Sequence, residues 1–157
     1  METRATATVH PRRPTALTGL VAALVLQGLG GLAGGVALLA GPQGQIIHLK
    51  TADLAGSPFH DYLVPGIILA VVLGVGPLVT SWVLIARPAS APLERTNPFH
   101  EYWGWTLSGV IGVGLLIWIA VEVTIIPFNV LQPVFGAVGL AIVVLTLWPS
   151  VRTFFSR

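Results

Sequence analysis

Long stretches without charged residues are the feature that most constrains this chain of 157 residues. Residues 14–49 and 62–86 contain no Asp, Glu, Lys or Arg, and residues 102–151 contain only Glu122. A helix needs about 20 apolar residues to cross a hydrocarbon core of about 30 Å. The candidate spans are residues 17–40, 62–86, 103–126 and 131–148. The sequence therefore predicts an all-α fold, a polytopic membrane four-helix bundle.

The composition leaves little room for a water-soluble domain. Hydrophobic residues make up 54% of the chain and charged residues 9%, which is too apolar for an ordinary soluble protein. The absence of cysteine excludes disulfides, thiolate catalysis and cysteine-based metal sites. A net charge of only +2 without a basic patch argues against nucleic acid as a partner. No nucleotide-binding, hydrolase or metal-ligand motif is present, so no metal or cofactor is expected.

The basic residues are distributed unevenly around the candidate spans. Seven of the eight fall on one side of the predicted topology: Arg4, Arg12, Arg13, Arg87, Arg95, Arg152 and Arg157. Cytoplasmic segments carry an excess of Lys and Arg. We therefore expect a multi-pass protein of the inner (cytoplasmic) membrane with both termini inside (N-in/C-in). Residues 1–16 are predicted to form a disordered cytoplasmic tail, residues 17–150 the bundle and residues 151–157 a second cytoplasmic tail.

Glycines in the first two spans predict close contacts between helices. Gly30 and Gly34 lie four residues apart in the first span, and Gly66 and Gly74 flank Ala70 in the second. Small residues at this spacing let helix backbones approach closely inside lipid. Packing within the chain is the favoured interpretation. A homo- or hetero-oligomer that docks through Gly30, Gly34, Gly66 and Gly74 is the alternative.

Polar, proline and aromatic residues within the spans carry further expectations. Gln27 lies in the middle of the first span and should form an interhelical hydrogen bond. Pro77 is expected to kink the second span, because proline removes a backbone donor. Trp103 and Trp105 open the third span and are expected in an aromatic belt at the membrane surface.

A short repeat precedes the second and third spans. Residues 57–62 read SPFHDY and residues 97–102 read NPFHEY. Ser or Asn suits a helix N-cap, Pro suits the first turn and an acid suits the positive end of the helix dipole. Shared helix-start chemistry is therefore the simpler interpretation. An inverted repeat of the transporter kind is the alternative, because the two copies fall on opposite sides of the membrane.

Glu122 is the strongest candidate for a functional residue, since an acid within an apolar span is costly to bury. One helical turn separates it from Trp118, which shares its helix face. Gln132 follows the short turn into the fourth span at a similar depth, so an antiparallel hairpin can bring it near Glu122. His60 and Asp61 open the second span on the same side of the membrane. These five residues are predicted to converge on a polar pocket near the outer leaflet.

Several functions fit this constellation. Glu122 could be a structural acid bonded to Gln132, could line a pocket for a lipid or other small amphiphile, or could transfer protons. The favoured prediction is a membrane-accessory or binding function, with membrane lipids and a small amphiphilic ligand as partners. A membrane enzyme or proton-coupled carrier that uses Glu122 as acid and base is one alternative. A structural subunit of a membrane complex is another.

Three segments resemble a group of small bacterial four-helix integral membrane proteins of the actinobacterial type. They are SPFHDYLVPG at residues 57–66, IWIAVEV at residues 117–123 and LQPVFG at residues 131–136. The resemblance covers roughly residues 17–150 and implies four spans. It also draws attention to Asp61, Glu122 and Gln132. More distantly, the architecture is similar to DoxX-like proteins, a likeness that implies no activity.

Overall fold

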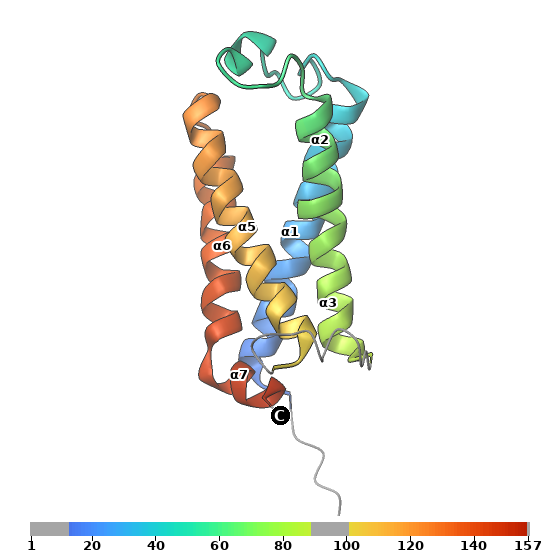
Figure 1. Ribbon diagram of the computed structural model, residues 1–157, viewed down its shortest axis with the longest axis vertical. Coiled ribbons are helices and arrows are strands. Elements are labelled where there is room, and N and C mark those ends of the chain that lie inside the picture. Colours follow the sequence, from blue (N-terminus) through green and yellow to red (C-terminus); the bar gives the residue numbers. More distant parts are fainter. Residues whose placement is uncertain (1–12, 89–100, 157) are drawn as a thin grey trace, which may run out of the picture.

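The computed structural model describes residues 13–88 and 101–156, and within these ranges it contains helices and loops without any strand. Its elements are α1 (Thr15–Ala40), η1 (Thr51–Leu54), α2 (Leu63–Ala70), the π-helical turn η2 (Val71–Val75), α3 (Gly76–Ala86), α5 (Trp103–Ile125), α6 (Leu131–Leu147) and α7 (Pro149–Phe155). The protein is therefore all-helical over the part of the chain that the structure describes (Figure 1).

Three helices are long and apolar enough to cross a membrane. They are α1, the continuous run Leu63–Ala86 formed by α2, η2 and α3, and α5. We call Leu63–Ala86 the α2–α3 run. The predicted fourth span differs, because α6 has only 17 residues and continues into α7 after a bend of 57°. The structure thus holds three candidate spans, or four if α6 and α7 together count as one.

The helices pack as two neighbouring pairs. α1 packs along the α2–α3 run, and α5 packs along α6. The short turn between α5 and α6 predicted this antiparallel pair. Contacts of α1 with α6 and of α3 with α5 join the pairs. The pairs lie together near α7 and farther apart toward the opposite end, which residues 41–62 cover (Figure 1). We call these two ends the α7 end and the loop end.

Glycines bring α1 against the backbone of the α2–α3 run. A Cβ at Gly35 would lie 2.5 Å from the Ala70 nitrogen, and one at Gly31 would overlap the Leu73 carbonyl group. Bare backbones at these positions allow the dense packing that associates helices in lipid. The four glycines named for an oligomer interface also contact side chains of this chain: Gly30 faces Phe135, Gly34 faces Leu69, Gly66 faces Leu38 and Gly74 faces Leu32.

Gln27 compensates for the backbone donor that Pro77 lacks. In a regular helix the Leu73 carbonyl would accept a hydrogen bond from the residue four positions later, which is Pro77. Instead, Gln27 Nε2 donates to the Leu73 carbonyl at 3.2 Å. This confirms the predicted interhelical hydrogen bond. The helix accommodates Pro77 with the π-helical turn η2, which lies directly before Gly76 and Pro77. The sequence analysis did not predict this turn.

The α7 end contains the larger hydrophobic core. Its buried side chains come from α1, α3, α5, α6 and α7: Leu17, Leu20, Leu24, Val83, Leu84, Tyr102, Trp105, Ile111, Ile142, Val151 and Phe155. Residues 151–157 were predicted to be a tail, yet Val151 and Phe155 of α7 are buried in this core. Trp105 is buried as well, and its Nε1 donates to the Thr146 carbonyl at 2.7 Å. Trp105 therefore joins α5 to α6 and is not a surface belt residue.

Candidate functional site

Glu122 lies in the last turns of α5 with a direct partner on its own helix. Trp118 Nε1 donates a hydrogen bond to Glu122 Oε2 at 3.0 Å. The spacing of four residues places both side chains on one face, as the sequence predicted. Both residues are half-buried. The indole therefore satisfies one carboxyl oxygen and fixes the orientation of the group.

Gln132 brings a second polar group to the same place from the start of α6. Its side chain is 1% exposed, and Oε1 accepts a hydrogen bond from the Asn129 backbone N–H at 3.3 Å. The side chains of Gln132 and Asn129 lie within hydrogen-bonding reach of the Glu122 carboxyl group. Even so, Gln132 Nε2 has no hydrogen-bond partner of regular geometry within residues 13–88 and 101–156. The buried Gln132 amide donor thus lies next to Glu122 without a hydrogen bond of regular geometry.

Asn129 is a residue that sequence analysis did not select. Its Oδ1 accepts a hydrogen bond from the Leu131 backbone N–H at 3.0 Å, which stabilises the first turn of α6. The turn Ile126–Val130 thereby holds Gln132 next to the end of α5. An Asn two residues before a helix start was the available signal, because Asx side chains often accept from that position. We call Trp118, Glu122, Asn129 and Gln132 the Glu122 site.

The other two predicted site residues have separate roles in the structure. Asp61 Oδ1 accepts a hydrogen bond from the Leu63 backbone N–H at 3.0 Å and so stabilises the start of α2. His60 is exposed. Among the interactions of the described residues, none joins His60 or Asp61 to Glu122, and no group of three His, Asp or Glu side chains there could hold a metal ion. Residues 118, 122 and 132 are brought together, whereas residues 60 and 61 are not bonded to them.

The first copy of the repeat does not place Ser57 at the N-cap of α2 as predicted, because α2 begins at Leu63 and its N-cap residue is Tyr62. Ser57 Oγ accepts from the Phe59 backbone N–H at 3.2 Å, two residues before the Asp61 that bonds Leu63. Most of the second copy, residues 97–100, lies outside the described residues. The inverted-repeat interpretation therefore stays a prediction.

The loop between α1 and α2 covers the end of α5 beside the Glu122 site. Leu38, Leu54 and Tyr62 form a small buried cluster, and Ile125 and Ile126 pack against it. The Tyr62 hydroxyl donates to the Lys50 carbonyl at 2.9 Å. Burial raises the pKa of Tyr62 above its ordinary value of 10.0, and the charge of Asp53 raises it further. Tyr62 is therefore a neutral donor at physiological pH and ties the loop to the start of α2.

Comparison of the chain with protein-family models, curated proteins and solved structures gives no match. The resemblance to small bacterial four-helix membrane proteins consequently rests on the sequence motifs alone.

The Glu122 site combines an acceptor and a donor in apolar surroundings. The carboxyl group can accept hydrogen bonds, or bind a cation when ionised, and the Gln132 amide can donate. Neighbouring side chains such as Val121, Val123 and Phe128 are exposed hydrophobic groups. Such a set can bind the polar head of an amphiphile while its apolar part lies along the helices.

Proposed function

We propose that this chain is a four-helix bundle of the cytoplasmic membrane, with both termini inside, that binds a lipid or other small amphiphile at the Glu122 site. Three or four apolar helices support the multi-pass arrangement. Among the described basic residues, Arg87 and Arg152 lie next to α3 and in α7, and Lys50 lies in the loop at the other end. This distribution supports the proposed orientation, in which the loop end and the Glu122 site face the outer leaflet.

The buried Gln132 Nε2, which has no hydrogen bond of regular geometry within the described part of the chain, is the observation that carries the proposal. Leaving a buried donor without a partner costs about 1–3 kcal/mol. A ligand oxygen that accepts from Nε2 removes this cost. The same ligand can donate to Glu122 from a hydroxyl, amide or ammonium group. An amphiphile whose head group carries both an acceptor and a donor fits this pair of residues.

Gln27 shows why the environment of Gln132 matters. Its Oε1 is also buried without a partner. However, Gln27 lies in the glycine-rich contact between α1 and the α2–α3 run, where backbone groups already fill the neighbouring space. No ionisable side chain is bonded to it among the described residues. Gln27 therefore provides a matched control for any experiment on Gln132.

Native mass spectrometry of the full chain, extracted together with membrane lipids, tests this function. The wild-type protein should retain an amphiphile whose mass identifies its class. Gln132→Met keeps the side-chain volume but removes the donor, and it should release the ligand. Gln27→Met should retain it. A wild-type protein that carries no amphiphile, or equal retention by Gln132→Met, would contradict the proposal.

The half-buried carboxyl group of Glu122 also supports an acid–base role in a membrane enzyme or proton-coupled carrier. Glu122→Gln separates the two functions, because the amide keeps the size and hydrogen-bonding capacity but cannot titrate. Ligand retention by Glu122→Gln, together with loss of proton uptake in proteoliposomes, would favour the carrier. Ligand retention without any proton uptake in either protein would favour binding alone.

A further inference from the structure

A second candidate binding site is a groove at the α7 end, between the start of α1 and the end of α3. It has a volume of about 180 Å³ and is lined by Arg13, Leu17, Thr18, Val21, Leu84 and Ile85. Leu17 and Leu84 are buried at 4% and 2% exposure and form its floor, while Ile85 is 45% exposed. The groove is thus apolar and open along one side. Among the described residues that line the groove, Arg13 alone is charged.

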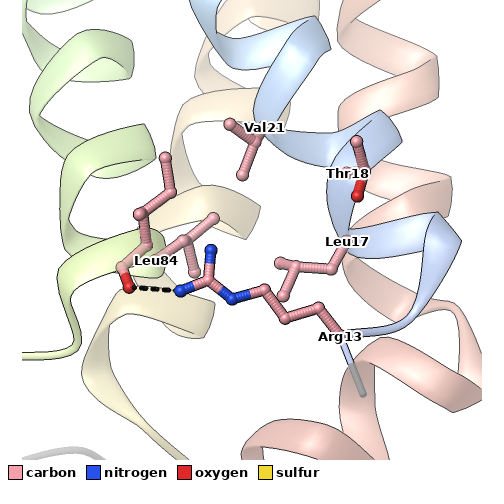
Figure 2. Close-up of a pocket in the computed structure, with 6 residues that line it drawn as sticks. Arg13, Leu17, Thr18, Val21 and Leu84 are labelled. Atoms are coloured by element: carbon pink, nitrogen blue, oxygen red, sulfur yellow. Dashed lines mark hydrogen bonds between the residues drawn. The ribbon is translucent and has the colours of Figure 1, made fainter.

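Arg13 joins the two helices that border the groove. Figure 2 shows its side chain reaching from the start of α1 to the end of α3, where Nη2 donates to the Ile85 carbonyl at 3.3 Å. A guanidinium group has five N–H donors, so most of them remain for another acceptor. The side chain is exposed. Its free donors therefore lie at the edge of an apolar groove.

The positive charge around this groove is not neutralised within the described residues. Arg87 follows α3 directly, and its guanidinium group stacks on Phe154 at 3.9 Å from the ring centroid. Burial lowers the pKa of Arg87, the charge of Tyr102 opposes this, and the charge of Arg13 lowers it again. The two arginines therefore place positive charge close together at this end of the protein. The ion pair in this region joins Arg152 to Glu101 at 3.6 Å, so no described acid is paired with Arg13 or Arg87.

We propose that the groove binds an anionic phospholipid, with one acyl chain between α1 and α3 and the phosphate on the Arg13 guanidinium group. An apolar slot with a cationic edge favours this molecule over a zwitterionic lipid, whose choline would bring a positive charge close to the two arginines. Arg13 and Arg87 together attract the phosphate, and Arg13 holds it through its planar fork of N–H groups. This site lies at the opposite end from the Glu122 site and does not depend on the function proposed there.

Lipid titrations of the full chain in detergent, followed by native mass spectrometry, test the proposal. Palmitoyl-oleoyl-phosphatidylglycerol should bind at least about tenfold more tightly than the matching phosphatidylcholine, which corresponds to one charge-assisted hydrogen bond. Arg13→Gln should remove this preference, because phosphatidylglycerol loses more affinity than phosphatidylcholine does. Arg13→Lys should keep part of it, because the charge remains without the fork. Lys50→Gln, which removes a positive charge at the loop end, is the control and should keep the full preference.

A groove-filling variant tests the acyl-chain part separately. Thr18→Trp leaves Arg13 in place and should weaken binding of the phosphatidylglycerol about tenfold or more, since the chain loses its slot. Melting temperatures of all variants without added lipid show whether each one is folded. Equal affinity of the wild type for both lipids, or an unchanged preference in Arg13→Gln, would overturn the proposal. Displacement of the lipid by millimolar inorganic phosphate would also overturn it, because the site would then select a free anion.

Discussion

The α7 end and the loop end of this protein are built from similar residues but are packed differently. At the α7 end, five helices contribute to one buried core, and Trp105 and Ser108 of α5 bind Thr146 of α6. At the loop end, the buried cluster that the structure describes contains three side chains, Leu38, Leu54 and Tyr62, and the Gln132 amide has no hydrogen bond of regular geometry to the described residues. Lipid supplies no hydrophobic force between helices, so dense contacts and hydrogen bonds decide where they associate. At the loop end, a ligand at the Glu122 site would accept the hydrogen bond that the Gln132 amide offers.

The largest expected effect concerns the contact on which both ends depend. Gly31→Val should place side-chain atoms into the Leu73 backbone and cost about 3 kcal/mol or more, because backbone cannot move aside as a side chain can. Gly114→Ala is the control, since a Cβ there has nothing within 4 Å. It should be neutral or gain up to about 1 kcal/mol from helix propensity. Thermal unfolding in detergent measures both. Similar stabilities of the two variants would show that α1 and the α2–α3 run are not held by backbone contact.

A matched pair of leucines compares the two ends directly. Leu20 at the α7 end is 0% exposed and Leu54 at the loop end is 5% exposed. Leu20→Ala should cost about 2–4 kcal/mol, since the surrounding core cannot collapse into the cavity. Leu54→Ala should cost less, about 2 kcal/mol at the low end of the range for buried leucines, because its small cluster can relax. Equal losses of unfolding free energy in the two variants would remove the distinction between the ends.

The hydrogen bond donated by Tyr62 should make the stability of the loop end depend on pH in the alkaline range. The pKa of Tyr62 is raised in the folded protein, so its stabilising effect is complete below the unfolded pKa of about 10 and is lost as pH rises through the folded value. Tyr62→Phe should cost about 1 kcal/mol at neutral pH and should lose less stability than the wild type above about pH 10. Phenolate absorbance and melting temperature across this range provide the measurement. A wild-type melting temperature that falls no more steeply than that of Tyr62→Phe would show that this phenol does not hold the loop.

Sequence analysis predicted the helical class and the approximate positions of the long helices, because charges mark where apolar segments end, but it did not predict α7. It also placed Trp118, Glu122 and Gln132 near one another, since helix periodicity and a short turn determine that geometry. Gln27 formed the interhelical bond that its mid-span position predicted.

The remaining features depend on neighbours that hydropathy does not specify. Trp105 was expected at the membrane surface, but its indole is buried against α6. A tryptophan near the end of a span can lie either at the surface or between helices, so the sequence did not distinguish the two positions. The π-helical turn depends on how Gln27 meets Leu73 across two helices. The burial of Val151 and Phe155 depends on the bend of α7 back onto the core. A nearly uniform apolar sequence predicts which residues lie inside the membrane. It does not predict which face of a helix packs against its neighbours.

The most direct test of the ligand site is the stability of delipidated Gln132→Met before and after the wild-type lipid extract is added. Without lipid, the variant should be about as stable as the wild type, because removing the buried Nε2 donor offsets the loss of the hydrogen bond that Oε1 accepts from the Asn129 backbone N–H. With lipid, only the wild type should gain stability, by an amount that grows with ligand concentration. If the variant is instead less stable without lipid and both proteins respond equally to the extract, Gln132 is a structural residue and the Glu122 site binds no ligand.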